Sequence, residues 1–99
     1  MAININDLKP FDAAEYLDTN ESIQAYISAA LETGDAQYIA STIGTVARAK
    51  GMSQLAKETG LSRESLYKTF SDKGNPNLKT LLAVTKALGV SLSAQTIAV

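Results

Sequence analysis

The stretch Met52–Phe70, MSQLAKETGLSRESLYKTF, has the pattern of two short helices joined by a tight turn. We expect Ser53 to cap the first helix and Gly60 to end it in a left-handed backbone conformation. Leu61 would then point inward from the turn, and Ser62 would cap the second helix. This spacing is typical of a helix-turn-helix, which leaves the outer face of its second helix free to contact DNA. The alternative is an ordinary helical hairpin.

The residues after this motif predict a loop, one further helix and a tail. Residues 71–76, SDKGNP, are turn formers, and Asn77 is placed to cap a helix that Gly89 stops. The tail, Val90–Val99, alternates in a way that suits a short strand paired with a second chain or a partner's sheet, and disorder is the alternative. The buried face of the helix is expected to comprise Leu78, Leu81, Leu82, Thr85 and Leu88.

The residues before the motif predict a longer helix that Asp35 caps and Gly51 ends. Gly44 inside it weakens the helix by about 1 kcal/mol relative to Ala, which indicates a close helix crossing at that point. Its apolar positions at helical spacing are Ile39, Ile43, Val46 and Ala47.

The first part of the chain predicts one more long helix and one short one. Asp18 and Glu21 have the spacing of a capping box ahead of a helix that Gly34 ends, and Asp12 and Glu15 repeat that spacing before a short helix at about residues 13–17. Residues 1–9 suit either an edge strand or an arm. The expected buried face of the long helix comprises Ile23, Ile27, Ala30 and Leu31.

Together these patterns predict an all-α fold, a compact bundle of about five or six helices with a short C-terminal strand or a disordered tail. Ninety-nine residues suit one domain. We divide it into an acidic helical extension (1–34), a helix-turn-helix core (35–89) and a tail (90–99).

The composition excludes several kinds of site. The chain has no Cys and no His, so disulfides, the common zinc sites and Ser-His or Cys-His catalytic pairs are ruled out. We therefore expect no enzyme activity, no metal and no cofactor. No apolar run approaches a membrane span, and the first residues carry acids where a signal peptide needs bases. We expect a soluble, cytoplasmic protein.

Charge is divided unevenly along the chain. Residues 1–47 contain seven acidic side chains and one basic one, a net charge of −6, whereas residues 48–99 contain eight basic and three acidic ones, a net charge of +5. Such asymmetry indicates a basic surface for nucleic acid and an acidic surface for another partner. Two solvated faces with segregated charge are the alternative.

If the second motif helix enters the major groove, its first turns face the base edges. Arg63 could donate two hydrogen bonds to guanine, Glu64 could accept one from cytosine, and Lys68 could reach a guanine or a phosphate. Tyr67 could pack on a thymine methyl or bond a phosphate. The alternative for Arg63 and Glu64 is a solvated helix start, and we favour Arg63 as a base reader.

Phosphate contacts are expected on either side of that helix, with affinity that falls as salt rises. A module of this size buries limited DNA surface, so we expect a symmetric dimer on a two-part operator. Solubility is the alternative role for the lysines of the loop. The expected phosphate-binding residues are Ser53, Gln54, Lys73, Asn75, Asn77 and Lys79.

The order of these elements resembles a known family. The segments FDAAEYLD, AYISAALETGD, IGTVARAKGM, LAKETGLSRESLYKTFS, GNP and TLLAVTKALG are similar to the HigA-like antidote proteins of bacterial addiction modules, within the lambda-repressor-like helix-turn-helix superfamily. The resemblance covers about residues 11–89. It implies an antitoxin that binds a small basic toxin of the RelE/ParE superfamily and represses its own operon. It assigns the DNA-reading role to Ser62, Arg63, Glu64, Tyr67 and Lys68.

The acidic half suits a basic protein partner, because carboxylates speed the association of oppositely charged proteins. For several of these residues, helix capping is an equally good interpretation. Two other functions remain open: a stand-alone transcriptional repressor without a toxin, and a protein-interaction module that has lost DNA binding. The expected toxin-facing carboxylates are Asp7, Asp12, Glu15, Asp18, Glu21 and Glu32.

Overall fold

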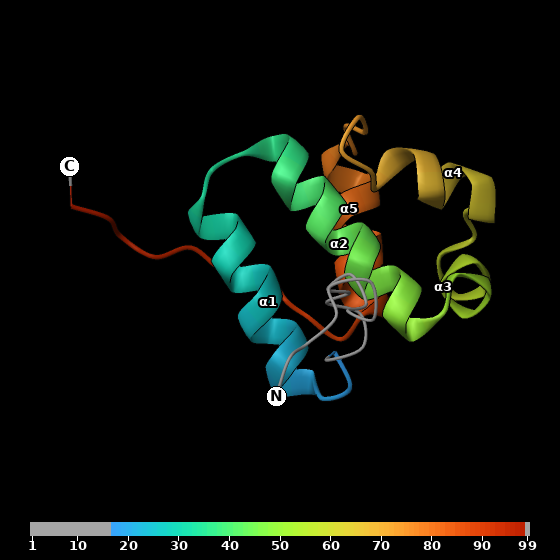
Figure 1. Cartoon of the computed structure of the whole chain (residues 1–99), viewed down its shortest axis with the longest axis horizontal. Coiled ribbons are helices and arrows are strands. Elements are labelled where there is room, and N and C mark those ends of the chain that lie inside the picture. The colour runs from blue at the N-terminus through green and yellow to red at the C-terminus, as the bar shows by residue number, and fades with distance from the viewer. Residues whose placement is uncertain (1–16, 99) are drawn as a thin grey trace, which may run out of the picture.

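The computed structural model describes residues 17–98, and this part of the chain folds into five α-helices without any strand. In Figure 1 the second helix runs through the middle of the molecule, the first lies on one side of it, and the third and fourth lie at the opposite end. The all-helical prediction is confirmed. The helices are α1 (Asn20–Glu32), α2 (Ala36–Lys50), α3 (Met52–Thr59), α4 (Arg63–Thr69) and α5 (Leu78–Ala87).

A capping box begins α1, one residue later than the sequence predicts. The backbone N–H of Ser22 donates to Thr19 Oγ1 over 3.0 Å, and the N–H of Thr19 donates to Ser22 Oγ over 3.2 Å. Thr19 has extended backbone angles (φ −124°, ψ 157°), so the chain becomes helical only after it. The predicted box of Asp18 and Glu21 is therefore wrong. The box of Asp12 and Glu15, and the short helix after it, lie outside the described residues.

The second helix, α2, is the element on which the others assemble. It begins as predicted, because Asp35 Oδ1 accepts from the N–H groups of Gln37 and Tyr38 over 3.0 and 3.2 Å. It packs against α1, α3 and α4. The close crossing predicted at Gly44 is confirmed: a Cβ added there would overlap the carbonyl oxygen of Phe70, at the end of α4. Only glycine admits that approach.

Gly51 joins α2 to α3 without any intervening loop. Its N–H donates to the carbonyl of Ala47 over 2.9 Å, and its φ of 113° turns the chain directly into the next helix. The predicted cap at Ser53 is wrong, since α3 starts at Met52 and no side chain caps it. Met52 is buried in the core, and this burial sets the start of the helix.

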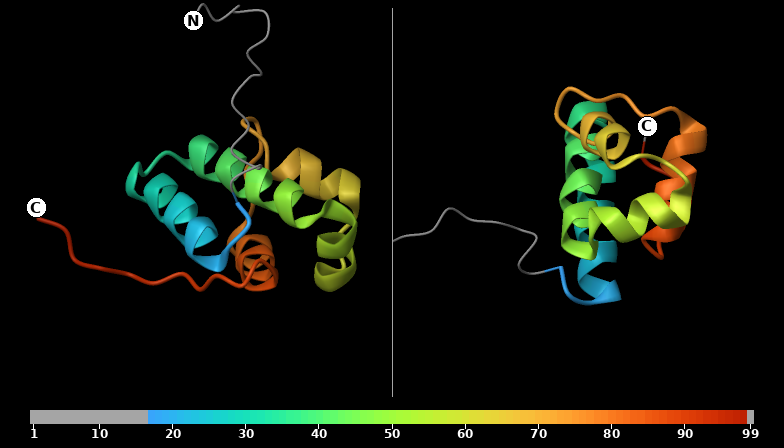
Figure 2. Two further views of the ribbon diagram at one scale, coloured as in Figure 1. Left: turned by 60° about the horizontal axis from the view of Figure 1, so that its bottom comes forward. Right: turned by 90° about the vertical axis from the view of Figure 1, so that its right-hand side faces the viewer.

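The turn between α3 and α4 follows the sequence prediction. Gly60 ends α3 in the left-handed region (φ 75°), and Ser62 Oγ accepts from the N–H of Ser65 over 3.0 Å at the start of α4. Asn77 caps α5 in the same way, accepting from the N–H of Thr80 over 2.8 Å. Figure 2 shows α3 and α4 at the end of the molecule away from α1.

One hydrophobic core joins all five helices. Leu66 and Phe70 enter it from α4, and Leu61 packs against it from the turn. No helix among residues 17–98 is long and apolar enough to cross a membrane. The remaining buried members of the core are Leu17, Ile23, Ile27, Ile43, Val46, Ala47, Met52, Leu55, Val84 and Leu88.

Two predicted buried faces and the tail need correction. On α5, Leu78 is 67% exposed and Leu82 is 47% exposed, because the buried face is instead centred on Val84 and Thr85. On α1, Leu31 is 39% exposed, since it lies at the edge of the helix's apolar arc. Residues 90–98 form no strand. A strand needs a neighbour to pair with, and no other strand exists in the part of the chain described.

Candidate DNA-binding and protein-binding surfaces

The outer face of α4 carries the four side chains predicted to read DNA. Leu66, fully buried, and Phe70 hold the inner face of the helix in the core. Positions one, two, five and six of the helix share the opposite face, since residues four apart are neighbours on a helix. All four side chains there are exposed, and Tyr67 is 45% exposed although its body is apolar. These residues are Arg63, Glu64, Tyr67 and Lys68.

Ser62, which the resemblance assigned to DNA reading, has a structural role. Its hydroxyl oxygen accepts the N–H of Ser65 and so caps α4. The residue is exposed, and its hydroxyl hydrogen is free to donate. Ser62 therefore sets where α4 starts, and with it the position of Arg63.

Ser53 and Gln54 lie exposed at the start of α3, as predicted. Because Gly51 provides no side-chain cap, the N–H groups of the first turn of α3 have no side-chain acceptor. The amide of Gln54 is already engaged, since its Nε2 donates to Glu58 Oε1 over 2.8 Å. A phosphate at this helix end would meet backbone N–H groups and the Ser53 hydroxyl first.

The loop between α4 and α5 is held by local contacts. Ser71 Oγ donates to the carbonyl of Lys68 over 2.9 Å, and Gly74 lies so close to the carbonyl of Thr69 that a Cβ there would overlap it. Asn77 uses its side-chain oxygen to cap α5, which leaves its amide N–H groups to donate elsewhere. The four predicted phosphate contacts of this region, Lys73, Asn75, Asn77 and Lys79, are all exposed.

The acidic surface lies around α1. Residues 17–47 carry four carboxylates and no Lys or Arg, a net charge of −4, and all four are exposed. Two views place α1 and α4 at opposite ends of the molecule, so the acidic helix faces away from the exposed face of α4 (Figures 1 and 2). Asp18, Glu21 and Glu32 belong to this surface. The other predicted toxin-facing residues, Asp7, Asp12 and Glu15, lie outside the described residues.

The sequence interpretation missed the exposed apolar side chains of this acidic end. Leu31 and Ile97 lie beside an open groove between α1 and the tail. The available signal was Leu31 itself, which directly precedes Glu32 in the last turn of the helix. In residues 17–98 no group of His, Cys, Asp and Glu side chains could hold a metal ion.

Comparison with known proteins identifies related chains. A family model described as "Probable addiction module antidote protein" matches residues 7–96. A Haemophilus influenzae protein described as "Uncharacterized protein" is 44% identical over 88 residues, which cover 89% of this chain and 91% of the relative. No solved structure matches the chain significantly.

Proposed function

Because the chain belongs to the family of probable addiction module antidote proteins, we propose that it is an antitoxin that binds DNA. In this proposal it neutralises a small basic toxin of the RelE/ParE type by direct binding. It also represses its own operon as a homodimer on a two-part operator, through a helix-turn-helix of the lambda-repressor-like kind formed by α3 and α4. Such a protein works in the cytoplasm and needs neither a cofactor nor catalysis.

The observation that carries the DNA-binding part is the exposed face of α4 over a buried inner face. Arg63 stands in the first turn, where a guanidinium can donate two hydrogen bonds to guanine O6 and N7. Glu64 suits cytosine N4, and Lys68 suits a guanine or a phosphate. Tyr67 offers a thymine methyl an apolar surface. Leu66 and Phe70 fix the helix, so these four side chains are presented as a set.

The contacts around α4 supply affinity in this proposal, and the reading helix supplies sequence preference. Lys73 and Lys79 are exposed cations on either side of Asn75 and Asn77, in and just after the loop that follows α4. Ser53 and the backbone N–H groups of α3 suit a phosphate on the other side. Contacts of this type lose strength as salt rises, because bound counterions are released.

The acidic α1 surface supports the toxin-binding part. Helix capping competed with partner binding as the role of Asp18 and Glu21, and that capping role falls to Thr19 and Ser22. Asp18, Glu21 and Glu32 are exposed on a stretch that carries no cation. A basic protein would be steered to this end of the molecule, away from α4.

A gel-shift titration against promoter DNA upstream of the gene tests DNA binding. Arg63→Ala should weaken binding to the operator by about tenfold or more and lower the preference for operator over random DNA, since one bidentate base contact contributes about 1–3 kcal/mol of discrimination. Lys73→Ala is the matched control: it should weaken operator and random DNA equally and reduce the salt slope by about one. If Arg63→Ala changes neither measurement, α4 does not read DNA.

Toxin binding is tested with the product of the neighbouring gene. Glu21→Gln combined with Glu32→Gln should slow association most strongly at low salt, because screening removes long-range steering at high salt. Glu58→Gln on α3 removes the same kind of charge from the other end of the molecule and should leave the rate nearly unchanged. Equal effects of the two changes would refute a directed acidic surface.

The runner-up function is a protein-interaction module that does not bind DNA. The overall net charge of −1 favours it, since most DNA-binding domains are basic. It predicts no salt-dependent shift of promoter DNA by the wild-type chain. A stand-alone repressor without a toxin predicts the opposite pair of results, a shifted promoter and no binding to the neighbouring gene product.

A further inference from the structure

The C-terminal segment 91–98 is extended, and its main chain is unpaired within the described part of the protein. The N–H of Val90 donates to the carbonyl of Thr85 over 2.9 Å, and no backbone hydrogen bond comes after it. Every residue of the segment except Leu92 is exposed. Extended backbone with free N–H and C=O groups is a template for pairing with another strand. Seven residues of it, 91–97, would span about 23 Å as a strand.

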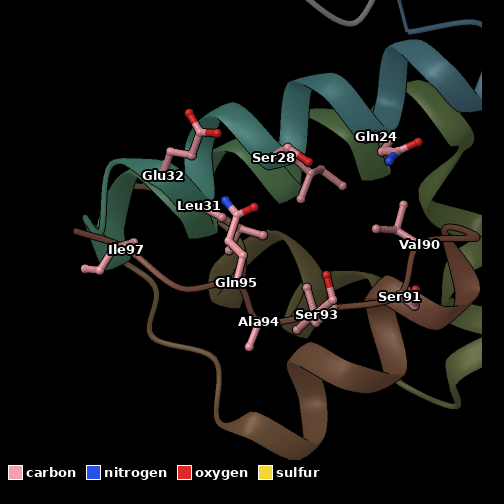
Figure 3. A pocket seen from close by; sticks show the side chains of 12 residues that line it. Gln24, Ser28, Leu31, Glu32, Val90, Ser91, Ser93, Ala94, Gln95 and Ile97 are labelled. Carbon is pink, nitrogen blue, oxygen red and sulfur yellow. The ribbon is translucent and has the colours of Figure 1, made fainter.

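An open groove of about 640 Å³ lies between this segment and α1. In Figure 3 Gln95 points toward Leu31 on α1, whereas Ala94 points away from the helix. The groove has an apolar floor, where Leu31 is 39% exposed, and Ile97 near its end is 77% exposed. Ser28 and Gln24 add polar groups along the α1 side. A strand laid beside the segment would cover Leu31 and pair its backbone at the same time.

The charges around the groove favour a cationic occupant. Neither α1 nor residues 90–98 contain a Lys or Arg, and α1 contributes Glu21 and Glu32. Glu32 lines the groove itself. A second copy that brought the same surface would place carboxylates against carboxylates, which is unfavourable. A basic protein would complement them.

We propose that residues 91–97 pair as a β-strand with the exposed sheet edge of a cationic protein, whose edge strand lies in the groove over Leu31. This inference rests on the proposed function, since it takes the basic toxin as that protein. Main-chain hydrogen bonds supply the affinity in this mode of binding, and the groove with its carboxylates selects the partner. The tail, which has no regular structure alone, thereby becomes part of the toxin-binding surface.

Proline substitutions test the pairing, because proline removes a backbone N–H and cannot extend a ladder. Adjacent residues of a strand direct their N–H groups to opposite edges, so Ser93→Pro and Ala94→Pro between them disrupt either register. At least one should weaken binding to the neighbouring gene product by about tenfold or more. Ser93→Ala keeps the N–H and should change binding less than about twofold. Both proline sites are exposed in the tail, so the unfolding temperature should stay unchanged.

The groove is tested separately. Leu31→Asn should weaken binding, whereas Leu82→Asn, a similarly exposed leucine on α5, should not. Amide hydrogen exchange of residues 91–97 should slow on complex formation, because paired N–H groups exchange slowly. Unchanged exchange in a formed complex would overturn strand pairing.

The possible outcomes separate this inference from the proposed function. If the wild-type chain does not bind the neighbouring gene product, both are refuted. If it binds and the two proline variants bind equally well, only the strand pairing is refuted. If the proline variants turn a wild-type dimer into monomers and leave toxin binding unchanged, the segment pairs with a second copy of the chain, and the inference is overturned.

Discussion

Replacing Gly44 by Ala tests how α4 is seated on α2. Gly44 lies inside α2, and an added Cβ would overlap the carbonyl oxygen of Phe70 and come within 3.1 Å of its carbonyl carbon. The obstacle is main chain at the end of α4, so no side-chain rotation relieves it. The substitution therefore requires α2 and α4 to move apart.

Two opposing contributions set the magnitude. Ala is favoured over Gly inside a helix by about 1 kcal/mol. Overpacking a well-packed site costs about 1–3 kcal/mol, and a main-chain obstacle places this site at the upper end of that range. The net expectation is a loss of about 2 kcal/mol in the free energy of unfolding. For a domain of this size that corresponds to a fall of about 8–16 °C in the unfolding temperature.

Thermal unfolding monitored by circular dichroism measures this loss. Ala49→Gly is the control, because Ala49 is exposed on the same helix and its replacement should cost only the propensity difference of about 1 kcal/mol. Since Phe70 ends α4, Gly44→Ala should also weaken operator binding at a temperature where the variant is still folded.

A rise of about 4–8 °C on Gly44→Ala, the result that helix propensity alone predicts, would refute this reasoning. It would mean that α4 moves aside at no cost. The close approach of Phe70 would then not be a constraint on the fold.

Three further substitutions can be measured in the same way. Ser62→Ala should cost about 1 kcal/mol through loss of the α4 cap, whereas Ser53→Ala should stay within about 0.5 kcal/mol because Ser53 caps nothing; equal losses would contradict the observed caps. Phe70→Ala should cost about 3–5 kcal/mol in urea unfolding, since the side chain is 2% exposed in the core. Leu82→Asn should leave stability within about 0.5 kcal/mol, and a core-sized loss would show that α5 buries it.

The helix ends could be predicted wherever they depend on neighbours in sequence. Asp35, Ser62 and Asn77 each bond an N–H two or three residues on, and Gly60 adopts the left-handed conformation that such a turn needs. Ser53 failed as a cap for a tertiary reason. Burial of Met52 draws the start of α3 back by one position, and only the folded core determines that burial.

The buried faces could be predicted only in part, because helical spacing defines a wider apolar arc than the neighbouring helices cover. Leu78, Leu82 and Leu31 satisfy the spacing and yet remain exposed at the edges of their helices. For the tail, alternation predicted extended backbone, but pairing depends on a second strand that the described chain does not contain. The exposure of the predicted DNA-reading set could be predicted from local spacing on α4, since Leu66 occupies the opposite face.

The single-residue junction at Gly51 has a consequence for how this protein can change length. Each residue added to or removed from an α-helical junction rotates the next helix by about 100°. An insertion between Lys50 and Met52 would therefore turn Met52 and Leu55 out of the core and carry α4 round with them. The loop at residues 71–77 could absorb an extra residue without such rotation, because helix contacts do not set its phase. We expect length variation among related chains to occur in that loop and to be excluded at residue 51.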